Sequence, residues 1–137
     1  MKQSITQETD YGCGIACFAF STEMSFSESA HYLGCSGKTS EGVPLKILFE
    51  SMNRYGLTSV RKYTKAHLAE RIKEEGTIVL TKRSNDYPVG HYLVRHNNKW
   101  MDPWITMLDD GDLKHAESGY RDELPGEAMY AILPIEI

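Results

Sequence analysis

The sequence predicts an α+β domain in which N-terminal helices pack on a C-terminal antiparallel sheet. Two observations predict this class. The first half of the chain carries apolar residues at helical spacing next to helix caps, and the second half carries short β-branched runs joined by turn residues. A length of 137 residues is typical of one domain, so we expect residues 1–137 to form a single folding unit.

Helices are expected over residues 13–20, 27–33, 44–55 and 65–75. The first segment is apolar throughout, but its two alanines and the polar residues after it favour a buried helix over a strand. Ser25 and Glu28 have the spacing of a capping box, and Gly56 provides a stop for the third helix.

Strands are expected over residues 77–81, 91–95, 99–102 and 128–133. Asn97 and Asn98 form the expected hairpin turn between the second and third of these strands. We expect residues 105–127 to be mostly loop, because this segment is rich in glycine and aspartate.

The composition excludes several classes of protein. A net charge of -4 disfavours nucleic acid and anionic membranes as main partners. The sequence has no run of 18 apolar residues and no signal peptide, so we expect a cytoplasmic protein. Three cysteines without a secretory signal do not predict a disulfide framework. No zinc-finger spacing or phosphate-binding glycine loop occurs, so we expect neither a metal nor a cofactor.

Cys13 is the first candidate for chemistry. It follows a glycine-containing turn and begins the first expected helix, where the helix dipole and free N–H groups favour a nucleophilic thiolate. Gly14 would leave room for a substrate backbone. By residue type alone, however, a buried and unreactive cysteine is the commoner case, and Cys17 fits that description well.

Three further residues could complete a catalytic site. His91, at the start of a strand, is a candidate general base. A hairpin at Asn97–Asn98 would bring Asp102 beside His91, where a carboxylate orients the imidazole. Gln7 is a candidate oxyanion donor together with the backbone N–H of Cys13. Taken singly, each also fits an ordinary structural role: an exposed histidine, a turn aspartate and a surface glutamine.

A substrate groove is expected near His91 and Asp102, because aromatic residues gather there in the sequence. The expected substrate-binding residues are Gly14, Tyr87, Gly90, Tyr92 and Trp104. An equally good interpretation is that half of the aromatic residues here, which include Trp100, only pack the sheet.

The order and spacing of these motifs resemble the double-glycine (bacteriocin-processing) cysteine peptidases, a papain-like family. Residues 7–17 read Gln-Glu-Thr-Asp-Tyr-Gly-Cys-Gly-Ile-Ala-Cys, similar to the family's Gln, Asp-Cys-Gly and Ala-Cys signature. Residues 91–94, His-Tyr-Leu-Val, resemble its histidine strand, and Asp102-Pro103 resembles its Asp-Pro motif. Residues 41–48 and 54–56 look like its middle helix and glycine stop.

The resemblance implies a papain-like fold with Cys13 as nucleophile, His91 as base, Asp102 as orienting residue and Gln7 as oxyanion donor. The expected partner is a peptide or protein substrate. The same catalytic groups would also suit a toxin or effector that deamidates or acylates a host protein. In that case the expected partner is a cognate inhibitor or immunity protein. A third hypothesis, from a different class, is a catalytically silent peptide-binding module.

Overall fold

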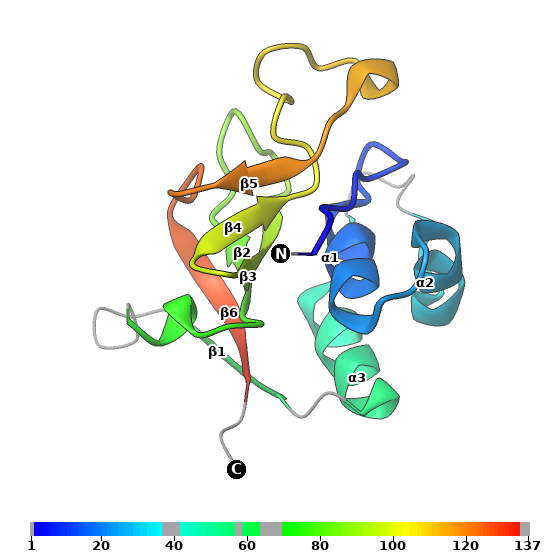
Figure 1. Ribbon diagram of the computed structural model, residues 1–137, viewed down its shortest axis with the longest axis vertical. Coiled ribbons are helices and arrows are strands. Elements are labelled where there is room, and N and C mark those ends of the chain that lie inside the picture. Colours follow the sequence, from blue (N-terminus) through cyan, green and yellow to red (C-terminus); the bar gives the residue numbers. More distant parts are fainter. Residues whose placement is uncertain (1, 37–41, 57–58, 64–69, 135–137) are drawn as a thin grey trace.

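The computed structural model describes residues 2–36, 42–56, 59–63 and 70–134, with the backbone alone for 59–63. Three helices form one layer and an antiparallel sheet forms the other (Figure 1). The helices are α1 (Cys13–Thr22), α2 (Phe26–Leu33) and α3 (Leu45–Tyr55). The predicted α+β class is therefore confirmed.

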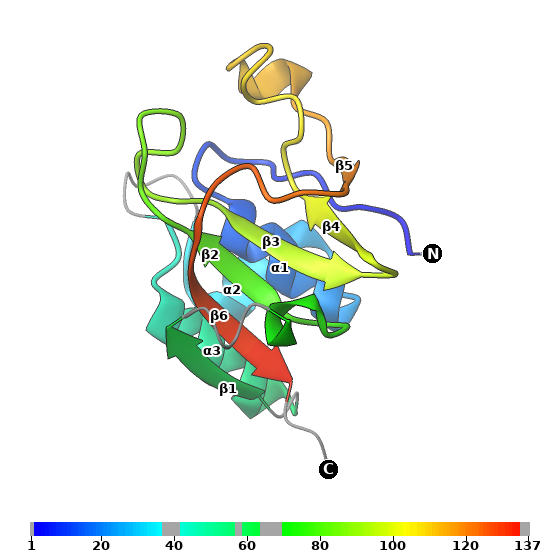
Figure 2. The same ribbon diagram turned by 90° about the vertical axis from the view of Figure 1, so that its left-hand side faces the viewer.

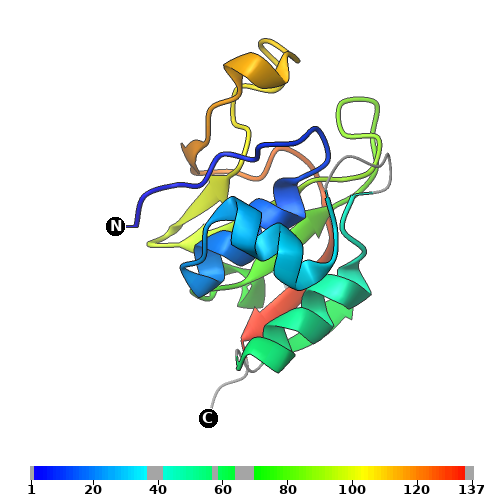
Figure 3. The ribbon, with the colours of Figure 1, turned by 90° about the vertical axis from the view of Figure 1, so that its right-hand side faces the viewer.

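Six strands pair in the order β1-β6-β2-β3-β4-β5 within the described residues, and every pair is antiparallel. Their bounds are β1 (Ser59–Tyr63), β2 (Ile78–Thr81), β3 (Tyr92–His96), β4 (Lys99–Asp102), β5 (Gly119–Arg121) and β6 (Ala128–Pro134). Figure 2 views the sheet with the helices behind it, and Figure 3 views the helices from the opposite side.

The helix α1 is the centre of the fold. Almost all of its side chains are buried, and it packs against β3, α2 and α3. Apolar side chains that alternate along the strands face either this helical layer or the other side of the sheet. Ile78 belongs to the core under the helices, whereas its neighbour Val79 belongs to the second cluster, where Ile72 covers the sheet. This packing fixes the start of α1 relative to the start of β3.

The predicted helix cap of α2 and the predicted turn of the β3–β4 hairpin are both confirmed. Ser25 and Glu28 form a reciprocal capping box. Asn97 and Asn98 have φ values of 54° and 66°, which suits the twist of a tight hairpin turn. The hairpin places Val94 opposite Met101.

Three predictions of secondary structure differ from the structure. The strand β1 was not predicted, and β5 lies in a segment expected to be loop. Both are edge strands whose pairing partners lie far away in the sequence, β6 for β1 and β4 for β5. The predicted helix over residues 65–75 lies partly outside the described residues, and its described part contains only the short 3-10 helix η2 (Arg71–Lys73).

Candidate active site

Cys13 is the first residue of α1, at the end of the helix that faces β3. Gly12 caps the helix, and a Cβ atom there would lie 2.5 Å from Thr9 Oγ1 and 2.7 Å from the Phe26 ring. The turn therefore requires a glycine directly before the cysteine. The Tyr92 backbone N–H donates to Cys13 Sγ at 3.5 Å, so the sulfur lies against the first residue of β3.

His91 and Asp102 form a buried hydrogen-bonded pair. His91 Nε2 lies 2.7 Å from Asp102 Oδ1, and their side chains are 3% and 0% exposed. Burial alone would lower the pKa of His91, but hydrogen bonds with Asp102 and Cys13 outweigh it and raise this pKa to about 9. Cys13, His91 and Asp102 are thus brought together as the sequence predicted.

Asp102 is held by two groups besides His91. The Trp104 backbone N–H donates to Oδ1 at 3.0 Å, and Arg121 Nη1 donates to Oδ2 at 3.1 Å. Burial would raise the pKa of Asp102, but hydrogen bonding and the charge of His91, with help from Trp104 and Arg121, hold it below its usual value. Asp102 is therefore a carboxylate whose two oxygens both have donors.

Arg121 is a site residue that the sequence did not reveal. It lies in β5 opposite Trp100, and this pairing aims its guanidinium at the carboxylate. The segment 105–127 offers no motif around Arg121, so only the tertiary pairing of β5 with β4 identifies it.

The loop before β3 fixes the imidazole ring of His91. Tyr87 stacks on this ring with centroids 4.6 Å apart and an interplanar angle of 22°. Gly90 has a φ of +80°, and a Cβ there would lie 2.6 Å from the Thr81 carbonyl oxygen. The His91 backbone N–H donates to Thr81 Oγ1 at 3.0 Å. These contacts hold His91 from its ring face and from its backbone.

Gln7 is buried beside the turn that precedes Cys13. Its Nε2 donates to the carbonyl oxygens of Thr9 and Asp10 at 3.0 and 3.1 Å. Its backbone N–H donates to the Pro103 carbonyl at 3.1 Å. Both amide hydrogens therefore serve the turn, while Oε1 has no hydrogen-bond partner among the described residues.

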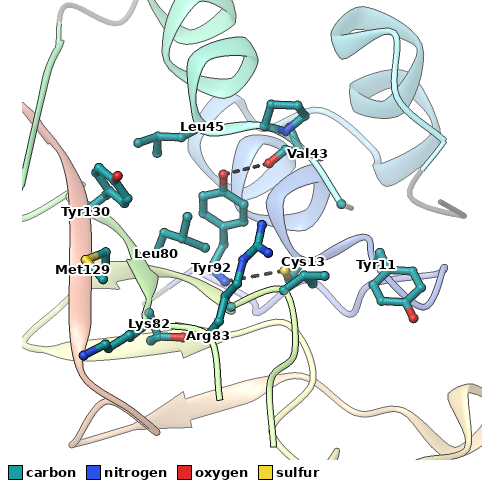
Figure 4. A pocket seen from close by; sticks show the side chains of 15 residues that line it. Tyr11, Cys13, Val43, Leu45, Leu80, Lys82, Arg83, Tyr92, Met129 and Tyr130 are labelled. Atoms are coloured by element: carbon teal, nitrogen blue, oxygen red, sulfur yellow. Dashed lines mark hydrogen bonds between the residues drawn. The ribbon is translucent and has the colours of Figure 1, made fainter. Parts of the chain in front are cut away.

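Two cavities meet at Cys13, and both are lined by Tyr11, Cys13, Val89 and Gly90. The cavity of about 480 Å³, here the Arg83 cavity, is shown in Figure 4. Its other lining residues are Gly42, Val43, Pro44, Leu45, Leu80, Thr81, Lys82, Arg83, Tyr92, Met129 and Tyr130. The cavity of about 440 Å³, here the His91 cavity, is also lined by Gln7, Asp10, Asn85, Asp86, Tyr87, Pro88, His91, Trp104, Met107, Leu108 and Gly111.

Most residues predicted to bind substrate line these cavities. Tyr92 lies in the Arg83 cavity, where its hydroxyl donates to the Val43 carbonyl at 2.8 Å. Tyr87 and Trp104 line the His91 cavity. Trp100 instead packs on the far side of the sheet, which agrees with the packing interpretation.

Gly14 requires a correction. A Cβ at this position would lie 3.0 Å from both the Tyr92 ring and Val43. The space that we expected for a substrate backbone is therefore filled by the protein's own side chains, and Gly14 serves the packing of α1 against β3.

Comparisons with known proteins show the fold but not a family. No family model matches the sequence, and no curated protein sequence matches it. A solved structure, the peptidase domain of Streptococcus ComA, a bi-functional ABC transporter involved in a quorum sensing pathway, superposes with a TM-score of 0.61. The match covers 96% of this chain and 97% of that chain at 14% sequence identity. The chain thus shares the fold of that peptidase domain.

Metal-ligand clusters and membrane-spanning helices are both absent from the described residues. No group of three or more histidine, cysteine or acidic side chains is arranged there to hold a metal ion. No helix in the described part of the chain is long and apolar enough to cross a membrane.

Proposed function

We propose that this protein is a papain-like cysteine peptidase of the double-glycine type, with Cys13, His91 and Asp102 as its catalytic triad. The observation that carries the proposal is the buried His91–Asp102 pair, hydrogen-bonded at 2.7 Å, with Cys13 beside it at the meeting point of two cavities. The shared fold with a peptidase domain supports it.

The reaction follows from these positions. His91 takes the proton of the Cys13 thiol, and the sulfur attacks the carbonyl carbon of a peptide bond. The C–N bond then breaks, the leaving amine takes the proton from His91, and a thioester remains on Cys13. Water, deprotonated by His91, attacks the thioester and releases the acid and the free thiol. Asp102 orients the imidazole and stabilises its positive charge throughout.

The oxyanion would lie near the N-terminus of α1, where the first backbone N–H groups have no partner within the helix. For Gln7 to contribute, one amide hydrogen must move from the carbonyl of Thr9 or Asp10 to the oxyanion. Gln7→Ala should then slow turnover by roughly 10²- to 10³-fold. Gln7→Glu, which removes the donor but keeps the size, should do the same, and an unchanged rate in both variants would remove this role.

Trp104 is a candidate for binding substrate in the His91 cavity. Its indole Nε1 is buried and has no acceptor among the described residues. A buried N–H without an acceptor is unfavourable, so a substrate carbonyl in this cavity would satisfy it. Trp104→Phe should therefore raise KM more than it lowers kcat.

Mass spectrometry of a peptide library and of intact proteins tests the proposed function. We expect new peptide termini with the wild-type protein and none with Cys13→Ala or His91→Ala, while circular dichroism shows both variants folded. A gain of about one dalton on glutamine without new termini would instead indicate deamidation. A stable peptide complex without any product, equal in wild type and Cys13→Ala, would indicate a silent binding module.

A further inference from the structure

The Arg83 cavity carries an unpaired cation beside the reactive sulfur. Arg83 is exposed and makes no hydrogen bond or ion pair with the described residues. Figure 4 shows its side chain extending into the cavity, which Tyr92 and Cys13 also line. A guanidinium aimed into a concave site, rather than at a carboxylate of its own chain, is free to bind a ligand.

The rest of the cavity favours a carboxylate as that ligand. Lys82 also lines it, and its Nζ lies 3.9 Å from the exposed Glu127 carboxylate, so this surface pair is weak. No acidic residue is among the described residues that line the cavity. Apolar side chains form its other walls, including Leu45, Leu80 and Met129, and they reduce the screening of a charge bound there.

The His91 cavity has more negative than positive charge, since two carboxylates line it against the single imidazolium of His91. Asp10 and Asp86 line it, and no lysine or arginine is among its described lining residues. A substrate that spans both cavities therefore meets a positive field on one side of Cys13 and a negative field on the other. This asymmetry selects both the sequence and the direction of a bound peptide.

We propose that Arg83 forms a carboxylate-binding subsite beside Cys13, which selects peptides with an acidic residue in the Arg83 cavity. As a statement about substrates, this rests on the proposed function. As a statement about binding, it depends only on Arg83 and Cys13 lining the same cavity. A planar guanidinium can hold a carboxylate through two parallel hydrogen bonds, which makes the contact selective as well as attractive.

Two alkylating reagents test the binding statement without any enzymatic turnover. Iodoacetate is negatively charged and iodoacetamide is neutral. The rate with iodoacetate divided by the rate with iodoacetamide therefore reports the local electric field at Cys13, and peptide mapping shows which cysteine has been alkylated. We expect this ratio to fall about fivefold in Arg83→Gln and further in Arg83→Glu, because about one unit charge near the sulfur is removed and then reversed. Both rates are measured at pH 7 and at pH 8.5, so that the reaction is fast enough to follow at one pH or the other.

The matched control is Lys73→Gln, which removes one positive charge in η2, outside both cavities. The ratio should not change in this variant. An equal ratio in wild type and Arg83→Gln would overturn the proposal.

Cleavage profiling tests the substrate statement. Wild type should prefer aspartate or glutamate at one position near the cut, Arg83→Gln should lose this preference, and Arg83→Glu should prefer lysine or arginine. The same library with amidated C-termini separates acidic side chains from free terminal carboxylates. Cleavage with the same residue preferences in wild type, Arg83→Gln and Arg83→Glu would overturn the proposed subsite. No cleavage together with an Arg83-dependent alkylation ratio would overturn the peptidase and leave the carboxylate site.

Discussion

Two histidine–aspartate pairs in this molecule have the same length but different surroundings. His91 Nε2 lies 2.7 Å from Asp102 Oδ1, and His115 Nδ1 lies 2.7 Å from Asp110 Oδ2. The side chains of the first pair are 3% and 0% exposed, whereas those of the second are 65% and 50% exposed. Water solvates and screens the second pair, so the close approach of its charges contributes little.

The difference lies in what surrounds each histidine. The hydrogen bond with Asp110 raises the pKa of His115, and the other contributors are the nearby charges of Asp110 and Asp112. His91 additionally interacts with a thiol, Cys13, and stacks on Tyr87. A histidine–carboxylate distance therefore does not by itself distinguish the two pairs; burial beside a thiol does, and it makes His91 the candidate base.

Among changes to the carboxylates of the two pairs and to Arg121, Asp102→Asn should lower turnover the most. The amide has nearly the same size but cannot offset the charge of the buried imidazolium, so the pKa of His91 should fall from about 9. Turnover in the proposed reaction should fall by about 10³- to 10⁴-fold. NMR titration of His91 measures the pKa change, and a pKa still near 9 would contradict the assigned cause.

The next largest expected effect is a loss of folding stability at alkaline pH. Because the pKa of His91 is raised in the folded protein, His91 contributes stability that is full below about pH 6.5 and is lost as the pH rises to about 9. The loss in the free energy of unfolding is on the order of 3 kcal/mol, measured by urea denaturation across this range.

Two variants identify the source of this pH dependence. His91→Gln should lack most of the loss, because it removes the titrating group. His115→Gln should keep it, because that exposed pair contributes little. Equal slopes in His91→Gln and wild type would show that the buried pair is not the source.

Arg121→Gln should have a smaller effect, because Arg121 positions Asp102 and does not touch the proposed nucleophile. Loss of this donor should raise the pKa of Asp102, since Arg121 is one of the groups that lower it. We expect turnover to fall about tenfold, with the acidic limb of the pH–rate profile moved to higher pH. Arg121→Lys should restore part of the rate. A lower rate with an unchanged profile would indicate only a structural role.

Asp110→Asn should have the smallest effect. The free energy of unfolding should not change measurably, and turnover should stay within about twofold of wild type. Thermal unfolding and the peptide assay measure both quantities. A large loss of activity would show that the segment around Asp110 contributes to the site, and the contrast between the two pairs would fail.

Local patterns explain why much of the site was predictable. Cys13 lies at the start of a helix that its own apolar sequence specifies. His91 and Asp102 are joined by a hairpin whose turn, Asn97–Asn98, is a strong short-range signal. The alignment of these two side chains follows from a register that local sequence determines.

Long-range pairing explains what was missed. Arg121 reaches Asp102 only because β5 pairs with β4, and nothing in its own segment predicts that strand. The space beside Gly14 is filled by Tyr92 and Val43, which come from distant parts of the chain. The bonds from Gln7 to the turn carbonyls follow from tertiary packing as well, since Gln7 is tied to Pro103.

The most direct test of whether His91 activates Cys13 is the rate at which iodoacetamide alkylates each cysteine at pH 6.5. Cys13 is 7% exposed and Cys35 is more exposed, so accessibility alone would make Cys35 the faster thiol. If His91 activates the sulfur, Cys13 should react at least about tenfold faster than Cys35, and His91→Gln should abolish this advantage. A Cys13 that reacts more slowly than Cys35, or that reacts equally in His91→Gln and wild type, would contradict the account.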